Sequence, residues 1–313
     1  MTSALTAEDR FGLLVGKSEV MHSVYQQIIM MSLSSIPVLI QGETGTGKEL
    51  AARTLHECGT PQHPFVPINC REYPADLFEA ELFGYVKGAF TGARSSRPGA
   101  IAQAQEGTLF LDEIGDLPLH QQPHLLRMIA EREYRPVGSS TVLPLCCRII
   151  AATNMPLKQA VVRGAFREDL YHRLNMLTIH MPPLRAHQED IPLLIHHFLE
   201  QEHATPNQLS PTFWHVVGER TRRRDWPGNV RTLQKYVFRG ICLDDAYLDT
   251  EWQRMTQRET GRPLTLLEYL SSQKKEYILR IWTQYQKVKA RVAEILDISI
   301  KTLERRLKEY QIE

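Results

Sequence analysis

The sequence lacks any apolar run long enough to cross a membrane. A membrane-spanning helix needs about 20 apolar residues, whereas stretches such as Ile28-Ile29-Met30-Met31 are soon interrupted by serine or proline. The first ten residues contain two acidic side chains and no apolar segment of the kind that a secretory signal carries. We therefore expect a soluble, cytoplasmic protein with no membrane insertion.

Cysteine is scarce, and neither sign of charge dominates. The 313 residues include 5 cysteines, an odd number with no C-x-x-C pair, so neither a disulfide framework nor a zinc site is expected and the thiols should be reduced and mostly buried. The formal net charge is +1, but residues 271–313 hold 10 basic and 6 acidic side chains, which leaves −3 for residues 1–270. A polyanionic partner is therefore expected to meet the C-terminal segment.

The composition, with 42% hydrophobic and 23% charged residues, excludes collagen-like and wholly disordered chains. Short apolar runs alternate with helical patterns; the runs are 38–40, 65–68, 108–111 and 149–152, and the helical stretches include 49–58 and 119–130. This alternation predicts an α/β fold with a parallel sheet covered by helices on both faces. Helical patterns dominate from Ile191 onward. We expect a tail at 1–10, an α/β subdomain at 11–180, a helical subdomain at 181–245, a linker at 246–272 and a DNA-binding domain at 273–313.

A phosphate-binding loop follows the first apolar run. Residues Gly42-Glu43-Thr44-Gly45-Thr46-Gly47-Lys48 fit the G-x-x-x-x-G-K pattern between a predicted strand and a predicted helix. Backbone N–H groups of such a loop surround phosphates, and Lys48 can reach the β and γ oxygens. Glu49 stands where the general pattern has Ser or Thr for Mg²⁺. A glycine-rich surface turn is the alternative, and the agreement of strand, spacing and helix disfavours it.

Two carboxylates and an amide end two further apolar runs. Asp112 is suited to hold Mg²⁺, and Glu113 to orient and deprotonate an attacking water. Asn154 can place its amide near the γ-phosphate. Taken alone, the carboxylates would be read as a helix-capping pair and the asparagine as a turn residue. In sequence order after a phosphate loop, they indicate nucleotide hydrolysis.

One short segment indicates what the nucleotide hydrolysis is used for. Gly88-Ala89-Phe90-Thr91-Gly92-Ala93, after Glu81-Leu82-Phe83-Gly84, resembles the GAFTGA signature of sigma-54-dependent transcriptional activators, the bacterial enhancer-binding proteins of the AAA+ ATPase class. The resemblance covers nearly the whole chain. It implies an AAA+ P-loop sheet, a helical lid, ATP with Mg²⁺, and contact between residues 88–93 and sigma-54. It also implies a ring, expected to be hexameric and built from this chain alone or with a paralogous subunit, that remodels the closed sigma-54 RNA polymerase complex.

Further roles follow from the resemblance, residue by residue. Asn69 matches the asparagine that restrains the catalytic glutamate, here Glu113. Arg167 and Arg173 match the arginines that reach the ATP of the neighbouring subunit, where a guanidinium stabilises charge on the transferred phosphoryl group. Arg231, in Trp226-Pro-Gly-Asn-Val-Arg231, matches the residue that senses bound nucleotide. A surface helix with ordinary ion pairs is the alternative for the two arginines.

The C-terminal segment has the pattern of a helix-turn-helix. Helices are predicted at 288–296 and 300–310 around a turn at 297–299. The expected packing sets Val292, Ile295 and Leu296 against Ile298, Leu303 and Leu307. This leaves Lys301, Thr302, Arg305 and Arg306 to contact upstream DNA. The segment resembles the Fis-like domain of the same activators, and a hairpin used only for dimerisation is the alternative.

About ten residues precede the expected ATPase domain, so we expect no N-terminal sensor domain. Control is then expected from a regulatory protein acting in trans, a hetero-oligomeric partner or expression level. In this the chain resembles the phage-shock activator and the activators of type III secretion genes. The sequence thus predicts an ATP-driven, sigma-54-dependent activator. The alternatives are an AAA+ chaperone or helicase loader, and a DNA-binding repressor with an inactive ATPase domain.

Overall fold

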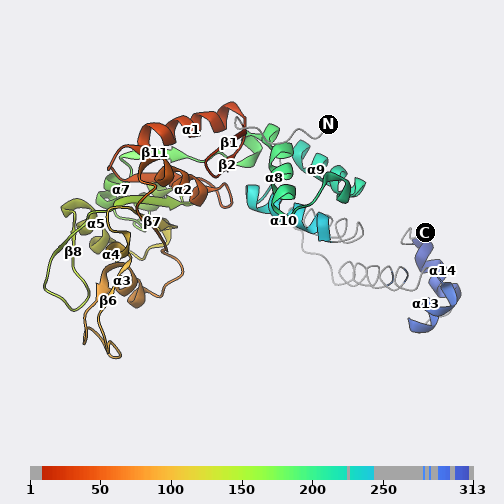
Figure 1. Cartoon of the computed structure of the whole chain (residues 1–313). Coiled ribbons are helices and arrows are strands. Elements are labelled where there is room, and N and C mark those ends of the chain that lie inside the picture. Colours follow the sequence, from red (N-terminus) through yellow and green to blue (C-terminus); the bar gives the residue numbers. More distant parts are fainter. Residues whose placement is uncertain are drawn as a thin grey trace. The chain divides into compact units, whose positions relative to one another are not determined.

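The computed structural model describes residues 9–223, 226–242, 278, 282, 288–296 and 300–309. They fall in two compact units, the first within 1–209 and 217–241, the second within 210–216 and 242–313 (Figure 1). The predicted linker at 246–272 and the predicted turn at 297–299 lie outside the described residues.

A parallel sheet forms the centre of the first unit. Its five strands, in spatial order, are β11 (Leu177–His180), β3 (Val38–Gln41), β10 (Arg148–Thr153), β7 (Thr108–Asp112) and β4 (Phe65–Asn69). The prediction of a parallel sheet is confirmed, and the four predicted apolar runs are four of its strands. Strand β11 was not predicted, because it lies at an edge and its apolar and polar residues alternate over only four positions.

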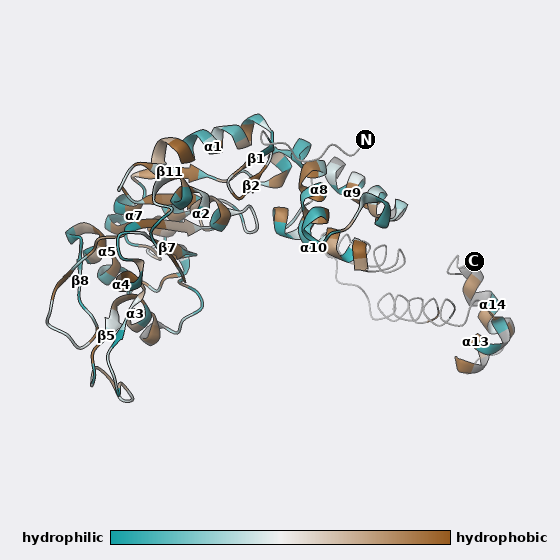
Figure 2. Ribbon diagram, viewed as in Figure 1, coloured by the Kyte–Doolittle hydropathy of each residue, from teal (hydrophilic) through white to brown (hydrophobic). Residues whose placement is uncertain are grey.

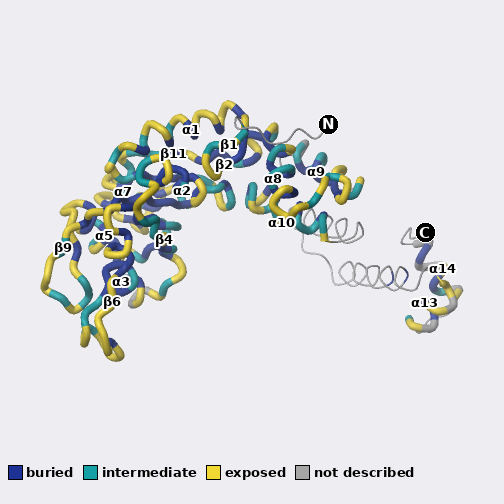
Figure 3. The backbone as a smooth tube through the Cα atoms, viewed as in Figure 1, coloured by how far each residue is buried: buried dark blue, intermediate teal, exposed yellow. Residues whose placement is uncertain are grey.

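Helices cover both faces of the sheet, as predicted. Because successive side chains of a strand point to opposite faces, Ile149 and Ala151 of β10 join one core while Ile150 and Ala152 join the other. The first core contains α3 (Ala75–Phe83), α4 (Ala100–Ala104), α5 (Gln122–Glu131), α6 (Leu157–Val162) and α7 (Glu168–Leu174). The second contains α1 (Glu19–Ser32) and α2 (Lys48–Gly59). Burial on both sides explains why the strands of the sheet are largely hydrophobic (brown in Figure 2) and buried (dark blue in Figure 3).

Helical elements follow β11 without a further strand among the described residues. They are η3 (Leu184–Ala186), η4 (Gln188–Asp190), α8 (Ile191–Gln201), η5 (Pro206–Gln208), α9 (Pro211–Arg223) and α10 (Asn229–Cys242). We call the part of the first unit after residue 181 the lid.

Asp190 joins the lid to the start of α1. The backbone N–H groups of Lys17 and Ser18 donate to its carboxylate at 2.8 and 3.0 Å, the Ser18 hydroxyl donates at 2.7 Å, and His187 Nδ1 lies 3.1 Å away. Burial alone would raise the pKa of Asp190, but these bonds hold it below its usual value. Ser18 also caps α1 by accepting from the N–H of Met21. The entrance to α1 is thereby fixed to the lid.

Three short antiparallel ribbons complete the described part of the first unit. They are β1 (Arg10–Phe11) with β2 (Leu14–Val15), β5 (Gly84–Tyr85) with β6 (Arg97–Pro98), and β8 (Glu133–Tyr134) with β9 (Leu143–Pro144). Strands of two residues carry no readable periodicity, so the sequence did not predict them.

The described part of the second unit contains α13 (Lys289–Ile295) and α14 (Ile300–Glu309). Val292, Leu303 and Leu307 are buried together, as predicted, and Leu296 packs against them. The prediction for Ile295 is wrong, because its side chain is 38% exposed. Buried Ile278 and Trp282 also belong to this core and were not predicted.

Two sequence expectations about cysteines have different outcomes. The five thiols are free, but only Cys70 and Cys147 are buried; Cys58, Cys146 and Cys242 are exposed, so the prediction of mostly buried thiols is wrong.

No described helix combines the length and apolar character that a bilayer crossing requires.

Candidate functional site

The phosphate loop lies between the end of β3 and the start of α2. Gly45 and Gly47 have φ of +78° and +91°, which a side chain would strain, and Gly47 precedes the first turn of α2. Lys48 is buried, and its ammonium donates to the carbonyl oxygens of Gly42 at 3.0 Å and Glu43 at 3.3 Å. The Thr46 hydroxyl also donates to the Glu43 carbonyl. The loop is therefore folded around its own lysine.

Opposite charges meet at this end of the sheet. Lys48 Nζ lies 3.9 Å from Glu113 Oε1. Burial lowers the pKa of Lys48, and the nearby Glu113 and Asp112 carboxylates oppose that shift. Burial, together with the charge of Glu113, raises the pKa of Asp112. Such mutual perturbation in a partly buried cluster is typical of functional sites.

Glu113 is held in an uncommon backbone conformation. Its φ of 50° and ψ of 47° are left-handed, a conformation that costs a non-glycine residue about 1 kcal/mol or more. Its carboxylate accepts from the N–H of Asn154 at 3.2 Å, and the Asn154 amide donates to the Thr44 hydroxyl at 2.9 Å. The structure therefore joins the ends of β7 and β10 to the phosphate loop, and brings together four predicted residues: Lys48, Asp112, Glu113 and Asn154.

Two predicted residues have other partners. Asn69 is aligned with Asp112 across β4 and β7, but its amide donates to Glu72 at 3.1 Å and its oxygen accepts from the N–H of Arg71. The predicted restraint of Glu113 by Asn69 is therefore not formed in this conformation. Glu49 accepts from Arg53 on the exposed side of α2.

The lid contacts the phosphate loop directly. Asn229 donates to the Glu43 carboxylate at 3.2 Å and to the Thr44 carbonyl at 3.0 Å. The predicted residue Arg231 donates from its backbone N–H to the Gly45 carbonyl at 3.3 Å. Arg185 forms a two-point ion pair with Glu43. Sequence reasoning missed Arg185 and Asn229, although Asn229 stands inside the quoted Trp226 to Arg231 motif.

The two predicted arginines lie at the start and near the end of α7. Arg167 precedes the helix, and its guanidinium donates to Asp169 at 2.7 and 3.0 Å. Arg173 is exposed in the last turn. The backbone N–H of Arg167 donates to the fully buried side chain of Gln122, which sequence reasoning also missed.

The segment 88–93 is a closed turn on the ribbon of β5 and β6. The Gly88 N–H donates to the Ala93 carbonyl at 2.9 Å, and the Ala93 N–H donates to the Phe90 carbonyl at 3.0 Å. Phe90 is 42% exposed, with its ring 5.0 Å from that of Tyr85, and Thr91 is exposed. Figure 1 shows the β5–β6 ribbon projecting from the sheet. The tip thus offers an aromatic ring beside a hydroxyl, as the sequence suggested.

A second segment supports the base of this turn. The Val137 N–H donates to the Gly84 carbonyl at 2.8 Å, and the Val86 N–H donates to the Val137 carbonyl at 3.1 Å. A Cβ on Gly138 would lie 2.7 Å from Ala89 Cβ, so the two backbones meet closely there. The turn is therefore supported by the connection between β8 and β9.

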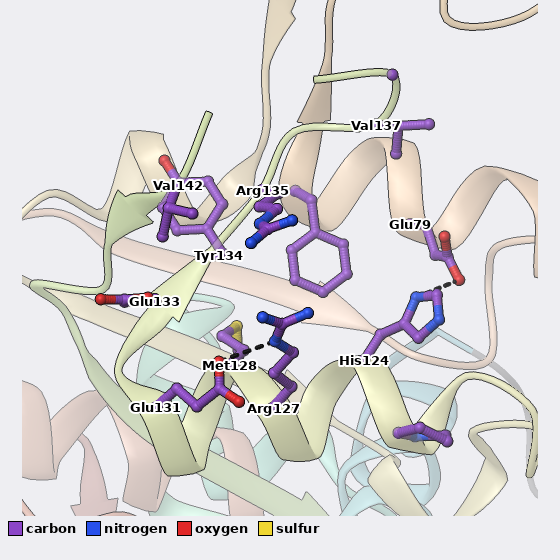
Figure 4. Close-up of a pocket in the computed structure, with 13 residues that line it drawn as sticks. Glu79, His124, Arg127, Met128, Glu131, Glu133, Tyr134, Arg135, Val137 and Val142 are labelled. Atoms are coloured by element: carbon purple, nitrogen blue, oxygen red, sulfur yellow. Dashed lines mark hydrogen bonds and ion pairs between the residues drawn. The ribbon is translucent and has the colours of Figure 1, made fainter. Parts of the chain in front are cut away.

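A groove of about 480 Å³ lies beside this junction, between α3, α5 and residues 133–142 (Figure 4). Glu79 pairs with His124 at 2.9 Å and Arg127 with Glu131 at 2.8 Å, while the guanidinium of Arg135 points into the groove. The groove belongs to the support of the projecting turn and is separate from the phosphate loop.

The predicted DNA-binding residues lie on one helix. Lys301, Thr302, Arg305 and Arg306 are all in α14. Lys289 of α13 pairs with Glu304 of α14 at 2.8 Å, which ties the two helices together.

Three known protein families match three successive segments of the chain. A model described as the sigma-54 interaction domain matches residues 14–180. The chain belongs to the sigma-54-dependent activator family. An AAA+ ATPase lid domain matches 185–251, and the Fis family of bacterial regulatory proteins matches 283–310. These matches do not favour the chaperone, helicase-loader or repressor alternatives.

Individual relatives of this sigma-54 family member are bacterial regulators. The DNA-binding transcriptional regulator NtrC of Rhizobium meliloti is 46% identical over 231 residues, covering 74% of this chain and 48% of NtrC. The formate hydrogenlyase transcriptional activator FhlA of Escherichia coli is 44% identical over 240 residues, covering 75% of this chain and 34% of FhlA. This chain therefore spans half or less of the length of these curated relatives.

A solved structure has the same fold. NtrX from Brucella abortus, crystallised with ATP, matches with a TM-score of 0.68 at 29% identity, covering 97% of this chain and 70% of NtrX. The predicted AAA+ fold class is thereby confirmed.

Proposed function

We propose that this chain is a transcriptional activator that uses ATP hydrolysis to remodel a closed sigma-54 RNA polymerase complex. One observation carries the proposal. A single subdomain holds both a phosphate loop, whose Lys48 lies beside Glu113 and Asn154, and a projecting turn with Phe90 and Thr91 at its tip. A hydrolytic site at the edge of the sheet and a contact surface on a ribbon of the same subdomain suit a protein that couples hydrolysis to movement of a partner. We assign the ATPase subdomain to 11–180, the lid to 181–245 and the DNA-binding domain to 273–313.

ATP would bind across the phosphate loop. Backbone N–H groups of residues 42–48 point toward phosphates in such loops, and Lys48 would exchange its two carbonyl partners for phosphate oxygens. An apolar cavity beside Thr46 and Gly47, lined by Leu14, Val15, Leu194 and Phe198 among others, is suited to the base. The cavity includes lid residues, and the backbone N–H of Arg231 donates to the Gly45 carbonyl of the loop, so Arg231 would respond to bound nucleotide.

The donor set fits Mg²⁺. Magnesium uses one or two carboxylates together with water and substrate phosphates, and Asp112 is such a carboxylate at the end of β7. No cage of three or more His, Cys, Asp or Glu occurs in the described part of the chain. When bound, Mg²⁺ would neutralise charge developing on the β- and γ-phosphates.

Hydrolysis requires a positioned base. Glu113 would accept a proton from the attacking water, and the N–H of Asn154 fixes the direction of its carboxylate. Asn69 would exchange Glu72 for Glu113 in another nucleotide state. Arg167 and Arg173 would complete the site of a neighbouring protomer, which requires a ring that we take to be hexameric.

Two further surfaces would determine which promoter complex the chain acts on. Phe90 and Thr91 would contact sigma-54, and α14 would contact upstream DNA through Lys301, Thr302, Arg305 and Arg306. The test is in vitro transcription from a sigma-54 promoter with ATP or a non-hydrolysable analogue. We expect open promoter complexes to form with ATP and not with the non-hydrolysable analogue. Activation of sigma-70 promoters with no effect on sigma-54 holoenzyme would contradict the proposal.

A further inference from the structure

Gln122 begins α5, and no part of its side chain is exposed. Its amide nitrogen donates to the carbonyl oxygens of Leu117 at 2.9 Å and Ala165 at 3.2 Å, and its amide oxygen accepts from the N–H of Arg167 at 2.8 Å. Two carbonyl acceptors and one N–H donor fix which end of the amide is which. The side chain therefore uses both of its donors and its acceptor on backbone groups.

These three partners come from two segments with different roles. Leu117 ends the 3₁₀ turn at Ile114–Asp116, which directly follows Glu113. Ala165 and Arg167 form the turn that leads into α7. One buried amide thus joins the backbone beside the hydrolytic carboxylate to the backbone that carries an arginine.

The side chain of Arg167 is held as well as its backbone. Its guanidinium donates to both carboxylate oxygens of Asp169, whose Oδ1 also accepts from the N–H of Leu170. The preceding Phe166 is buried. Gln122 adds a hydrogen-bonded link from this arrangement to Leu117, in the segment that follows β7 and Glu113.

We infer that Gln122 is a positioning residue for Arg167, fixing the arginine relative to the segment that follows Glu113 in the same protomer. The inference rests on the proposed function, in which Arg167 serves the ATP of a neighbouring protomer. A protomer that lacks Gln122 should keep its own phosphate loop but fail to assist its neighbour. Displacements of about 1 Å in a catalytic arrangement can lower rates about 100-fold.

Complementation in mixed rings tests this. In the whole 313-residue chain, Gln122→Met keeps the size of the side chain and removes the amide. We expect ATPase activity reduced about 10-fold or more and unchanged affinity for a fluorescent ATP analogue. Lys48→Ala, which lacks a working phosphate loop but has an intact Arg167, should also be inactive alone. Mixing the two should restore activity several-fold above the separate proteins, because each supplies what the other lacks.

Arg167→Ala mixed with Lys48→Ala is the matched control. If that mixture recovers activity and the Gln122→Met mixture does not, the inference is overturned while the proposed function stands. If neither mixture recovers, the arginine does not act between protomers, and both the ring mechanism and the inference fail. Full activity of Gln122→Met alone would also overturn the inference. Should Gln122→Met not fold, Gln122→Asn, which keeps a neutral amide but is one methylene too short to bridge the two segments, replaces it in the same mixtures with the same outcomes.

Discussion

Arg185 of the lid and Glu43 of the phosphate loop form a two-point ion pair. Arg185 Nη1 donates to Glu43 Oε2 at 2.8 Å, Nη2 donates to Oε1, and Asn229 adds a bond to Oε2 at 3.2 Å. A free carboxylate at this point of the loop would repel a triphosphate. Because the lid supplies the neutralising charge, its contact with the loop and the binding of phosphate would favour one another.

The first prediction concerns this pair. A double-mutant cycle with Glu43→Gln and Arg185→Gln should give a coupling of about 0.5 to 1 kcal/mol in the free energy of urea unfolding. Both side chains are about half exposed, so solvent limits the value. The matched control is Arg127 with Glu131, an exposed helical pair that should couple more weakly. A coupling no larger than that of the control would contradict the two-point geometry.

The second prediction concerns pH. Hydrogen bonding from Arg185 holds the pKa of Glu43 at about 2, against an ordinary value of 4.5. A lowered folded pKa stabilises the fold above the ordinary pKa, and that stability is lost as pH falls toward 2. The wild type should therefore lose more stability than Glu43→Gln when the pH falls from 5 to 3. The difference between their free energies of unfolding should decrease by a measurable amount of up to about 1 kcal/mol. Urea unfolding at both pH values measures this, and an unchanged difference would refute it.

The sheet was predictable and the lid contacts were not, for a physical reason. Strands such as 108–112 are buried on both faces and read as apolar runs, and the loop at 42–48 has a fixed spacing of glycines and lysine. Arg185 and Asn229 gain these partners only through tertiary contacts, across as many as 186 residues for Asn229 and Glu43. Gln122 likewise reaches Ala165 and Arg167 across 43 and 45 residues. Asn229 stands inside the motif from Trp226 to Arg231, but that motif does not show which of its side chains meets the phosphate loop, and no local pattern marks Arg185. Ile295 was placed wrongly because helical spacing alone does not settle which residue at the edge of an apolar face is covered.

The third prediction concerns Glu113. Glu113→Ala should bind ATP but hydrolyse it at least about 100-fold more slowly, because general-base catalysis contributes on that scale. Phosphate release and binding of a fluorescent analogue measure the two steps. Glu131→Ala removes a carboxylate from the exposed Arg127 pair and should turn over normally. Normal turnover by Glu113→Ala would remove it as the catalytic carboxylate.

The fourth prediction separates hydrolysis from its use. Thr91 lies at the exposed tip of the 88–93 turn, on a ribbon remote in sequence from the phosphate loop. Thr91→Ala should therefore retain ATPase activity within about twofold of wild type, since surface substitutions are usually mild, while failing to open a sigma-54 promoter complex. Permanganate footprinting beside phosphate release measures both. Full promoter opening by this variant would show that the hydroxyl is not part of the contact.

The last prediction concerns DNA. If phosphate contacts dominate, the logarithm of the binding constant should fall linearly with that of salt concentration, and removing one phosphate-binding cation should reduce the slope by about 1. We expect Arg305→Gln in α14 to reduce this salt-dependence slope by that amount. Lys289→Gln removes the same charge from α13, where the ammonium is bound to Glu304, and should leave the slope unchanged. Titrations of a labelled upstream site at several salt concentrations distinguish the two variants. Equal slopes for Arg305→Gln and the wild type would mean that α14 does not meet the backbone through this residue.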